Sequence, residues 1–177
     1  MSSIRLSVLA LSGSLRTASI NSAFCRALVR LAPPGMNAFH YDSLGELPLF
    51  NPDLESAPPA AVGRFRDAIA AADALVIASP EYAHGISGVL KNALDWLVSF
   101  EGVVGKRVAL VNTSPRAHHA LESLTEVLRT MSLEIVDRAS PALALLGYLR
   151  TADEMAASAE VSAAVRAIFE ALASESR

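Results

Sequence analysis

Three short loops hold most of the residues in this chain that are suited to chemistry, and the first runs from Ser12 to Ser19. With the two residues after it, this loop reads Ser-Gly-Ser-Leu-Arg-Thr-Ala-Ser-Ile-Asn, which provides four hydroxyl groups, one guanidinium and one amide. A phosphate monoester carries nearly two negative charges and needs many hydrogen-bond donors at once. Hydroxyls, backbone N–H groups and the start of a helix supply such donors. The loop therefore predicts a site for a terminal phosphate.

Other phosphate-binding patterns fit this loop less well. A dinucleotide pyrophosphate requires a GxGxxG pattern, and here Gly13 is the only glycine of the loop. A P-loop would need a lysine that the loop lacks. Asp42 follows the second predicted strand, where a Rossmann enzyme holds a ribose, but the glycine pattern that should accompany it is missing. An ordinary capped turn, which is the alternative, would not need so many donors.

The second loop, Ser79–Ser87, predicts a rigid surface for a flat heterocycle. Pro80 stiffens the exit from a strand, and Gly85 allows a tight backbone turn. Exposed N–H and C=O groups of such a loop can contact the polar edge of a ring, while Tyr82 offers an aromatic wall.

Apolar runs of strand length alternate with helical patterns along the chain. The predicted strands are Ile4–Leu11, Met36–Tyr41, Ala74–Ser79, Arg107–Thr113 and Leu133–Val136, the last of which we expect to resume through Pro141–Leu145 after a bulge or turn. The predicted helices follow apolar residues spaced three or four apart, at positions 20–31, 62–72, 89–97, 121–131 and 161–172. The third and fourth strands are apolar without alternation, which is typical of strands buried on both faces.

Strict alternation of strands and helices predicts a parallel sheet with helices on both faces, a three-layer α/β sandwich. Five strands favour the flavodoxin-like order 2-1-3-4-5 over a six-stranded dinucleotide fold, and residues 1–177 are predicted to form a single domain. In such a sheet the ligand binds beyond the carboxyl ends of the strands, where the strand order reverses. The two loops above and a third, Thr113–His119, are predicted to lie at these ends.

The composition argues against several classes of partner. The net charge is −3 and the 15 Lys and Arg residues are scattered, so we expect no surface for nucleic acid and no polybasic anchor for a membrane. Cys25 is the only cysteine and is expected to be buried, and it can form neither an intramolecular disulfide nor a CxxC motif. The apolar run Leu6–Leu11 is too short for a secretory signal. We expect a cytoplasmic protein with small-molecule partners.

Taken together, the loops resemble those of the NADPH-dependent FMN reductases, a group with chromate-, quinone- and azo-reducing members. The resemblance rests on three motifs and runs from about Ile4 to about Val136. The motifs are Gly13-Ser14-Leu15-Arg16 with Ser19 and Asn21, then Pro80-Glu81-Tyr82, and Leu90-Lys91-Asn92-Ala93-Leu94-Asp95-Trp96. One motif alone would be weak, but together they are specific.

The resemblance implies a site for FMN, with NADPH or NADH as co-substrate and a homodimer or homotetramer as the assembly. The implied cofactor-binding residues are Ser14, Leu15, Arg16, Ser19, Ile20 and Asn21 around the phosphate, Pro80, Glu81, Tyr82 and Ala83 at the ring edge, and Ser114 beside the flavin. No residue is predicted to be a catalytic acid or base, because hydride transfer from a nicotinamide to a flavin needs no proton from the protein. Glu81 is therefore expected to support the loop or to contact the ring edge.

The chain departs from the family pattern at three places. Ala83 stands where the family commonly has Asn, and Ser87 stands where Pro is frequent. The third loop reads Ser-Pro-Arg-Ala-His-His instead of beginning Ser-Pro-Gly, and Leu121 occupies a later position that is often Arg. We expect these departures to affect the choice of acceptor and nicotinamide and not FMN binding.

Three histidines near these loops are assigned ordinary roles. His118 and His119 are predicted to point to different sides of a helix, and no Cys or carboxylate near them completes a metal site. His84 is expected to be a solvated loop residue.

The third motif and an apolar segment before it are predicted to be structural. Lys91 and Asp95 should form an ion pair on a helix surface, since they are four residues apart. Trp96 fits either the core or a subunit interface. The segment Leu44–Leu54 is expected to pack over the end of the sheet or against a neighbouring subunit.

The leading hypothesis is an FMN-dependent enzyme that oxidises NAD(P)H and reduces flavins, quinones or related small acceptors in a ping-pong cycle. Two alternatives remain, a flavodoxin-type electron carrier that binds FMN without turnover of its own and a flavin-binding scaffold or sensor. Carriers tend to be strongly acidic, whereas this chain is only mildly so. Oxidation of NAD(P)H by the purified protein separates the enzyme from both alternatives.

Overall fold

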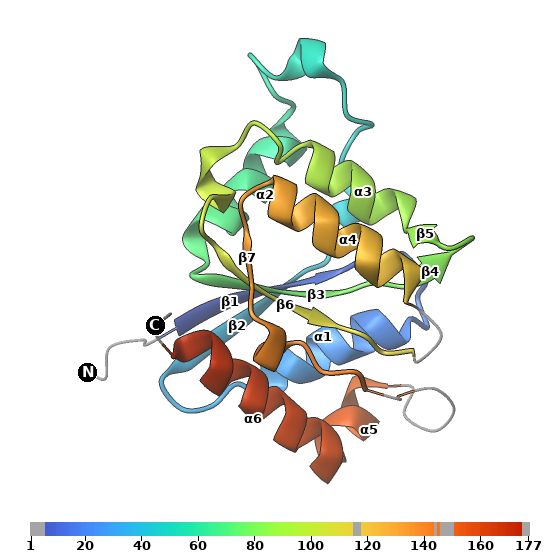
Figure 1. Cartoon of the computed structure of the whole chain (residues 1–177), viewed down its shortest axis with the longest axis vertical. Coiled ribbons are helices and arrows are strands. Elements are labelled where there is room, and N and C mark those ends of the chain that lie inside the picture. The colour runs from blue at the N-terminus through green and yellow to red at the C-terminus, as the bar shows by residue number, and fades with distance from the viewer. Residues whose placement is uncertain (1–5, 115–117, 144, 146–150, 175–177) are drawn as a thin grey trace.

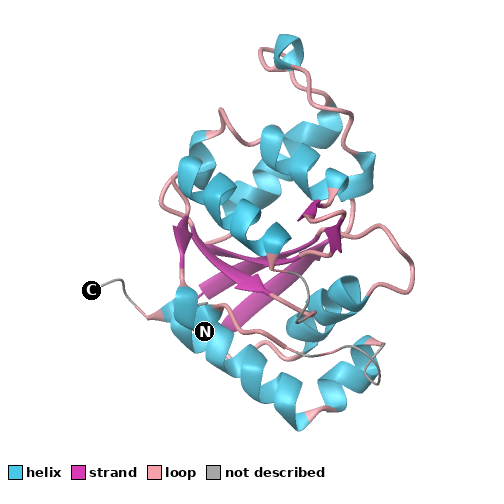
Figure 2. Ribbon diagram, turned by 45° about the vertical axis from the view of Figure 1, so that its right-hand side comes forward, coloured by secondary structure: helices cyan, strands magenta, loops and turns pink. Residues whose placement is uncertain are grey.

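The computed structural model describes residues 6–114, 118–143, 145 and 151–174, and these form a three-layer α/β arrangement (Figures 1 and 2). A five-stranded parallel sheet lies in the middle, in the order β2-β1-β3-β6-β7. Its strands are β1 (Leu6–Ser12), β2 (Met36–Tyr41), β3 (Ala74–Ala78), β6 (Arg107–Val111) and β7 (Glu134–Ile135). The predicted flavodoxin-like order 2-1-3-4-5 is confirmed. The predicted first strand began at Ile4, which lies outside the described residues.

Helices cover both faces of the sheet (Figure 1). One face carries α2 (Ala60–Ala71), α3 (Gly88–Asp95) and α4 (His119–Thr130), and the other carries α1 (Ile20–Arg30), α5 (Ala152–Ala157) and α6 (Ala159–Ala173). Alternate residues of β3 therefore enter two separate apolar clusters, with Leu75 and Ile77 in one and Val76 and Ala78 in the other. This double burial explains why β3 is apolar throughout.

The predicted last strand is interrupted, as the sequence suggested. Only two residues of β7 pair with β6, and the chain then turns through a short 3-10 helix, η4 (Asp137–Ala139). Pairing resumes where Asn112 bridges to Ala142, since the N–H of Asn112 donates to the carbonyl of Pro141 and that of Leu143 donates to the carbonyl of Asn112. The sheet edge is thus extended by a discontinuous segment.

Two elements escaped the sequence analysis. The second loop, read as irregular, contains an antiparallel hairpin of β4 (Glu81–Tyr82) and β5 (Gly85–Ile86). Its two-residue turn, Ala-His, lacks the Asn-Gly or Asp-Gly signal that marks such turns in a sequence. Helix α5 did carry a signal, because Thr151 and Glu154 form a capping box with both reciprocal bonds present.

Residues of the third sequence motif hold the segment around Pro48 and Phe50 against α3. The amide of Asn92 donates to the carbonyl of Pro48 at 3.0 Å and accepts from the N–H of Phe50 at 2.8 Å. The indole N–H of Trp96 donates to the same Pro48 carbonyl at 2.8 Å, and its ring meets Phe50 edge-on with centroids 5.1 Å apart. Trp96 is fully buried. The sequence analysis predicted either a core position or a subunit interface for Trp96, and the structure places it in the core of this chain.

The segment Leu44–Leu54 divides into a packed part and a projecting part. Leu44 and Leu47 are buried in the core above the sheet, whereas the Leu49 side chain is 85% exposed. Beyond it, η2 (Pro52–Leu54) stands clear of the helices at the top of Figure 1. The expectation that the segment packs over the sheet end is correct for its first half. None of the helices within the described residues is long and apolar enough to cross a bilayer.

We expect Asn92→Ala to lower the free energy of unfolding by about 1–3 kcal/mol, because it leaves the partly buried N–H of Phe50 without an acceptor. Lys91→Ala is the matched control on the same helix, since its ion pair with Asp95 is exposed and should contribute less than about 1 kcal/mol. Urea unfolding of both variants measures the difference. Equal losses of unfolding free energy in the two variants would contradict this structural role of Asn92.

Candidate functional site

The first two loops are in direct contact at the carboxyl ends of β1 and β3. The N–H of Gly13 donates to the carbonyl of Ala78 at 2.9 Å. A Cβ added at Gly13 would lie 2.3 Å from the Ser79 hydroxyl oxygen and 2.9 Å from that of Ser87. No side chain fits there, so the single glycine of the first loop is explained by the second loop and not by a ligand.

Hydrogen bonds of serine hydroxyl groups stabilise the first loop internally. The Ser12 and Ser22 hydroxyls lie 2.8 Å apart, and the Ser22 hydroxyl also donates to the carbonyl of Ser14 at 3.3 Å. The Ser12 and Ser14 hydroxyls accept from the N–H groups of Ser14 and Arg16, each at 3.3 Å. Sequence reasoning gave no role to Ser22, although its place in the first turn of a helix behind a serine-rich loop is a usable signal.

The predicted phosphate-binding residues gather at the start of α1. Ser14, Ser19 and Asn21 are buried, and the Ser19 hydroxyl caps the helix by accepting from the N–H of Ser22. The N–H groups of Ile20 and Asn21, in the first helical turn, have no acceptor within the helix. This end of α1 therefore offers backbone, hydroxyl and amide donors together.

The Leu15 and Arg16 side chains lie on the outside of the same loop. Both are exposed, and Leu15 leans over Gly45, where a Cβ would lie 3.0 Å from it. Only the backbone of Leu15 can contribute to a phosphate site from this position. The Arg16 guanidinium has no partner among the described residues and is free to turn toward an anion.

A hydrogen bond joins the third loop to the first. The Thr113 hydroxyl donates to the side-chain oxygen of Asn21 at 2.7 Å, and both residues are buried. This bond orients the Asn21 amide, because its oxygen faces Thr113. The NH₂ group is then left as a donor at the start of α1. Thr113 was not among the predicted site residues, because no local pattern connects positions 92 residues apart.

The hairpin of the second loop has a strained turn. Ala83 and His84 have φ values of 48° and 59°, the left-handed conformation that a type I′ turn requires at both central positions. Asn adopts this conformation more easily than Ala. The Asn that the resemblance led us to expect at position 83 would suit this backbone conformation, and Ala83 adopts the same turn without the Asn side chain.

Glu81 holds the hairpin against α4. Its carboxylate accepts from the N–H of Ala120 in the first turn of that helix at 2.8 Å, where the N-cap residue His118 provides no side-chain cap. The carboxylate is thereby committed to a structural bond, which supports the expected role in loop structure. Pro80 precedes the hairpin as a partly buried residue, and the Tyr82 ring is half exposed on its outer side.

Three histidine rings stack beside this contact. The ring centroids of His118 and His119 are 4.1 Å apart, and those of His84 and His119 are 4.3 Å apart. The prediction that His118 and His119 point to different sides was wrong, because His118 is the N-cap and lies outside the helix. His84 is exposed, as expected, but its ring packs on His119. The described residues contain no group of three His, Cys, Asp or Glu side chains arranged to hold a metal.

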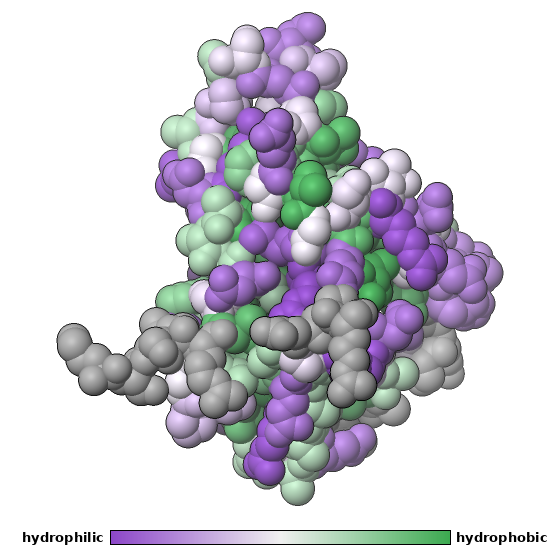
Figure 3. Space-filling view, turned by 60° about the vertical axis from the view of Figure 1, so that its left-hand side comes forward, coloured by the Kyte–Doolittle hydropathy of each residue, from purple (hydrophilic) through white to green (hydrophobic). Residues whose placement is uncertain are grey.

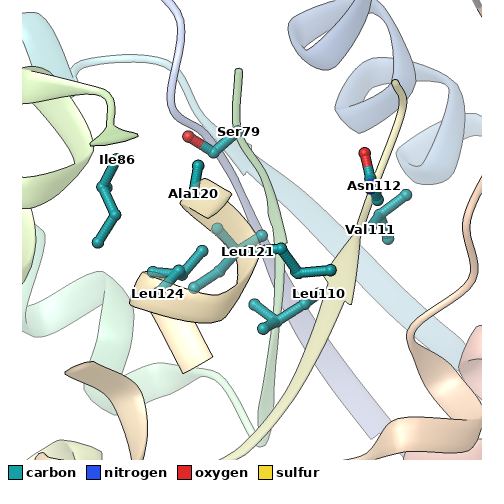
Figure 4. Close-up of a pocket in the computed structure, with 9 residues that line it drawn as sticks. Ser79, Ile86, Leu110, Val111, Asn112, Ala120, Leu121 and Leu124 are labelled. Carbon is teal, nitrogen blue, oxygen red and sulfur yellow. The ribbon is translucent and has the colours of Figure 1, made fainter. Parts of the chain in front are cut away.

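Ser114 is positioned by a hydrogen bond from its backbone to the side chain of Asn112. Its N–H donates to the side-chain oxygen of Asn112 at 3.0 Å, one residue beyond the Thr113 bond to Asn21. The departure from the family pattern that begins at Arg116 falls partly outside the described residues, since Arg116 and Ala117 are not among them. Leu121, the later departure, lies on α4 and faces the sheet (Figure 4).

The small cavity in Figure 4 is a packing defect and not a cofactor site. Side chains of the hairpin (Ile86), of β6 (Leu110) and of α4 (Leu124) surround a space of about 20 Å³. That volume holds about one water molecule. A flavin ring would have to bind outside it, over the exposed hairpin and the Ser114 backbone.

The residues that the structure brings together fit FMN at its phosphate end. Ser14, Ser19 and Asn21 are buried donors at one helix terminus, and Arg16 adds an exposed positive charge. The first loop touches the second through Gly13 and the third through Asn21. Nine of the eleven predicted residues lie on these three loops, and the other two, Ile20 and Asn21, lie in the first turn of α1 directly after the first loop. Their contacts with a cofactor remain a prediction.

Comparison with known proteins agrees with this arrangement. The sequence profile of the NADPH-dependent FMN reductase family matches residues 6–147. An NAD(P)H-dependent FMN reductase of Pseudomonas aeruginosa is 50% identical over 92 residues, which are 51% of this chain and 49% of that protein. A quinone reductase of Escherichia coli is 39% identical over 114 residues, which are 62% of this chain and 60% of that protein. The chain spans about half to three fifths of the length of these relatives.

Solved structures show the same fold over nearly the whole chain. A flavoenzyme NAD(P)H:(acceptor) oxidoreductase from Paracoccus denitrificans has a TM-score of 0.76 at 25% identity, with 94% of this chain and 97% of that one covered. The apo form of an NADH:FMN oxidoreductase has a TM-score of 0.64 at 24% identity, covering 94% and 88%. Because the family profile covers most of the sequence, including all three loops, the chain belongs to the NADPH-dependent FMN reductase family.

Proposed function

We propose that the protein binds FMN and uses NADPH or NADH to reduce a small acceptor such as a flavin or a quinone. The observation that carries the proposal is the cluster of buried donors Ser14, Ser19 and Asn21 at the start of α1, joined by Thr113 to the loop that ends β6. Family membership supports the same reading. When bound, FMN supplies the hydride and electron chemistry, and the protein supplies binding and orientation.

The chain's own residues divide this work between three loops. Ser14, Arg16, Ser19 and Asn21 hold the phosphate, with the backbone of Leu15 and Ile20 between them. The Pro80–Ala83 segment contacts the edge of the ring, and Ser114 lies beside it. The strained turn at Ala83 and His84 keeps the hairpin's backbone groups in a fixed orientation, which suits recognition of a flat polar edge.

No acid or base is needed from Glu81. Its carboxylate is already bonded to the N–H of Ala120, and transfer of a hydride requires no proton from the protein. We assign Glu81 to the positioning of the hairpin against α4. In the proposed ping-pong cycle the nicotinamide and the acceptor use the same open face of the flavin in turn.

We also propose a homodimer or homotetramer in the cytoplasm. Leu49 is exposed on a segment that Asn92 and Trp96 hold rigidly against α3, and an exposed apolar side chain on a rigid support is suited to a subunit contact. The face in Figure 3 shows apolar residues scattered among hydrophilic ones, and its projecting tip is mostly hydrophilic. Cys25 is a buried free thiol, which suits a reducing compartment.

The assembly is tested by light scattering at micromolar concentrations, with Leu49→Asp as the variant. We expect the native chain to have the mass of a dimer or larger and the variant to shift toward the monomer, since a charge at a buried contact is unfavourable. A monomeric native chain across this range would remove the proposal.

The activity is tested by following NADPH and NADH oxidation by FMN-loaded protein with a quinone or free flavin as acceptor. We expect repeated turnover with both kinds of acceptor and parallel-line kinetics, the pattern of a ping-pong cycle. Stoichiometric reduction without turnover would instead identify an electron carrier or a sensor.

Arg16→Ala should weaken FMN binding roughly ten- to hundredfold, about 1.5–3 kcal/mol, because a charge-assisted contact with the phosphate is lost. Binding of riboflavin, which has no phosphate, should not change. Calorimetry at two salt concentrations measures both, and the effect on FMN should shrink as salt screens the phosphate.

Glu81→Gln is the control for the second loop. Gln keeps an oxygen that can accept from Ala120, so FMN-saturated protein should retain most of its rate of flavin reduction in stopped-flow measurements. The assignment of the loops is reversed if Glu81→Gln slows reduction about a thousandfold while Arg16→Ala binds FMN normally.

A further inference from the structure

The hairpin of β4 and β5 is too short to be rigid by itself. Each strand has two residues, and they pair as Glu81 with Ile86 and Tyr82 with Gly85. A two-stranded hairpin in isolation is at best marginally stable in water, even when it is longer than this one. Figure 1 shows the hairpin beside the start of α4. Its conformation must therefore depend on contacts with neighbouring elements.

Two contacts hold the base of the hairpin, the end that is farther from the turn. Glu81 accepts from the N–H of Ala120 at 2.8 Å, and its cross-strand partner Ile86 packs against the core cluster to which α4 contributes. The other end is exposed, since Tyr82 is 53% exposed and Ala83 is exposed as well. Both strands are thus anchored at the base, whereas burial does not hold the end with the turn.

The turn also lacks the residues that favour its conformation. A type I′ turn prefers Asn or Gly at its central positions, and Ala83 has no polar side chain that could stabilise the left-handed backbone locally. In the described part of the chain, the side-chain interaction that reaches the turn is the stack of His84 on His119. Their ring centroids are 4.3 Å apart and their planes differ by 33°.

His119 is the middle ring of a stack of three. On its other side lies His118, with ring centroids 4.1 Å apart and planes that differ by 39°. His118 and His119 end the third loop, while His84 belongs to the second, so the stack joins these two loops. Gly13 joins the first loop to the second, and Thr113 joins the third to the first. With the stack, each of the three loops is in contact with the other two.

We propose that His119 is a positioning residue for the flavin ring. Packed between His84 and His118, it holds the turn at Ala83 and His84 in the left-handed conformation, so that the hairpin is oriented for the ring edge before the flavin binds. The stack thereby provides what the intrinsic preference of Asn would provide at position 83. The proposal rests on the proposed FMN site and deepens it, because it makes affinity for the ring depend on a residue that acts through the hairpin.

Calorimetry with FMN and riboflavin tests whether His119 acts on the ring, since both ligands have the same ring and only FMN has the phosphate. We expect His119→Ala to weaken both by the same factor, roughly three- to tenfold, as for the loss of one aromatic pair. His119→Phe keeps an aromatic ring and should restore most of both affinities. A loss confined to FMN, or a Phe variant as weak as the Ala variant, would overturn the proposal.

Two further variants on the same side of the hairpin serve as controls. Glu126→Ala removes an exposed side chain of α4 about two turns from His119 and should change neither affinity. His118→Ala removes an outer ring and leaves the contact of His84 with His119, so it should weaken both flavins less than His119→Ala does. An effect of Glu126→Ala as large as that of His119→Ala would contradict a specific role for the stack.

Ala83→Asn tests the link between the turn and the stack. In this background we expect His119→Ala to weaken both flavins less than about twofold, because Asn adopts the turn without external support. The comparison is made with Ala83→Asn alone, so that any direct effect of the new side chain cancels. The same fold-change in both backgrounds would show that His119 does not act through the turn.

Hydrogen exchange of flavin-free protein separates this proposal from the proposed function. We expect His119→Ala to speed exchange of the amides at 81–86 while β3 stays protected, and His119→Phe to exchange like the native chain. Faster exchange throughout the chain would reveal a general loss of stability and overturn the positioning role. If the native chain binds neither flavin, the FMN assignment fails, and the exchange still tests the stack. If flavin binds and turns over but His119→Ala changes neither the exchange nor the affinities, only the positioning role fails.

Discussion

Gly13 lies against Ser79 and Ser87 with no space for a methyl group, and this close approach sets the distance between the first two loops of the site. The contact is possible because β1 and β3 are neighbours in a parallel sheet, so that both loops begin at the carboxyl ends of adjacent strands. The remaining connections build on it. The bond from Thr113 to Asn21 attaches the third loop, and the bond from Ala120 to Glu81 fixes the hairpin to α4.

Several residues that identify the family in the sequence are structural in this chain. Asn92 and Trp96 share the carbonyl of Pro48 as acceptor and hold the segment before α2 against α3. Glu81 completes the hydrogen bonding at the start of α4. Each of these residues satisfies a partly buried backbone group that would otherwise lack a hydrogen-bond partner. A sequence motif can therefore contain residues that support a binding site structurally as well as residues that contact the ligand.

The candidate site combines relaxed and strained backbone. The first loop, Ser12–Ser19, is stabilised by its own hydroxyls and by the capped start of α1. The hairpin instead places Ala83 and His84 in the left-handed region, where non-glycine residues are disfavoured. Its pairing within the hairpin, the bond at Glu81 and the stack of His84 on His119 offset that strain. The strain is concentrated where the ring edge is expected to bind, as is common in functional sites.

The layers, the strand order and the loops at the carboxyl ends of the strands could all be predicted from the sequence alone. These follow from local signals: uninterrupted apolar runs such as 74–78, helical periodicity, and the breaks at prolines and glycines. The contacts between side chains, by contrast, could be identified only in the folded chain. The pairs Thr113–Asn21 and Glu81–Ala120 join residues from separate elements. Their proximity depends on how helices pack across the sheet, which no local pattern of one chain encodes.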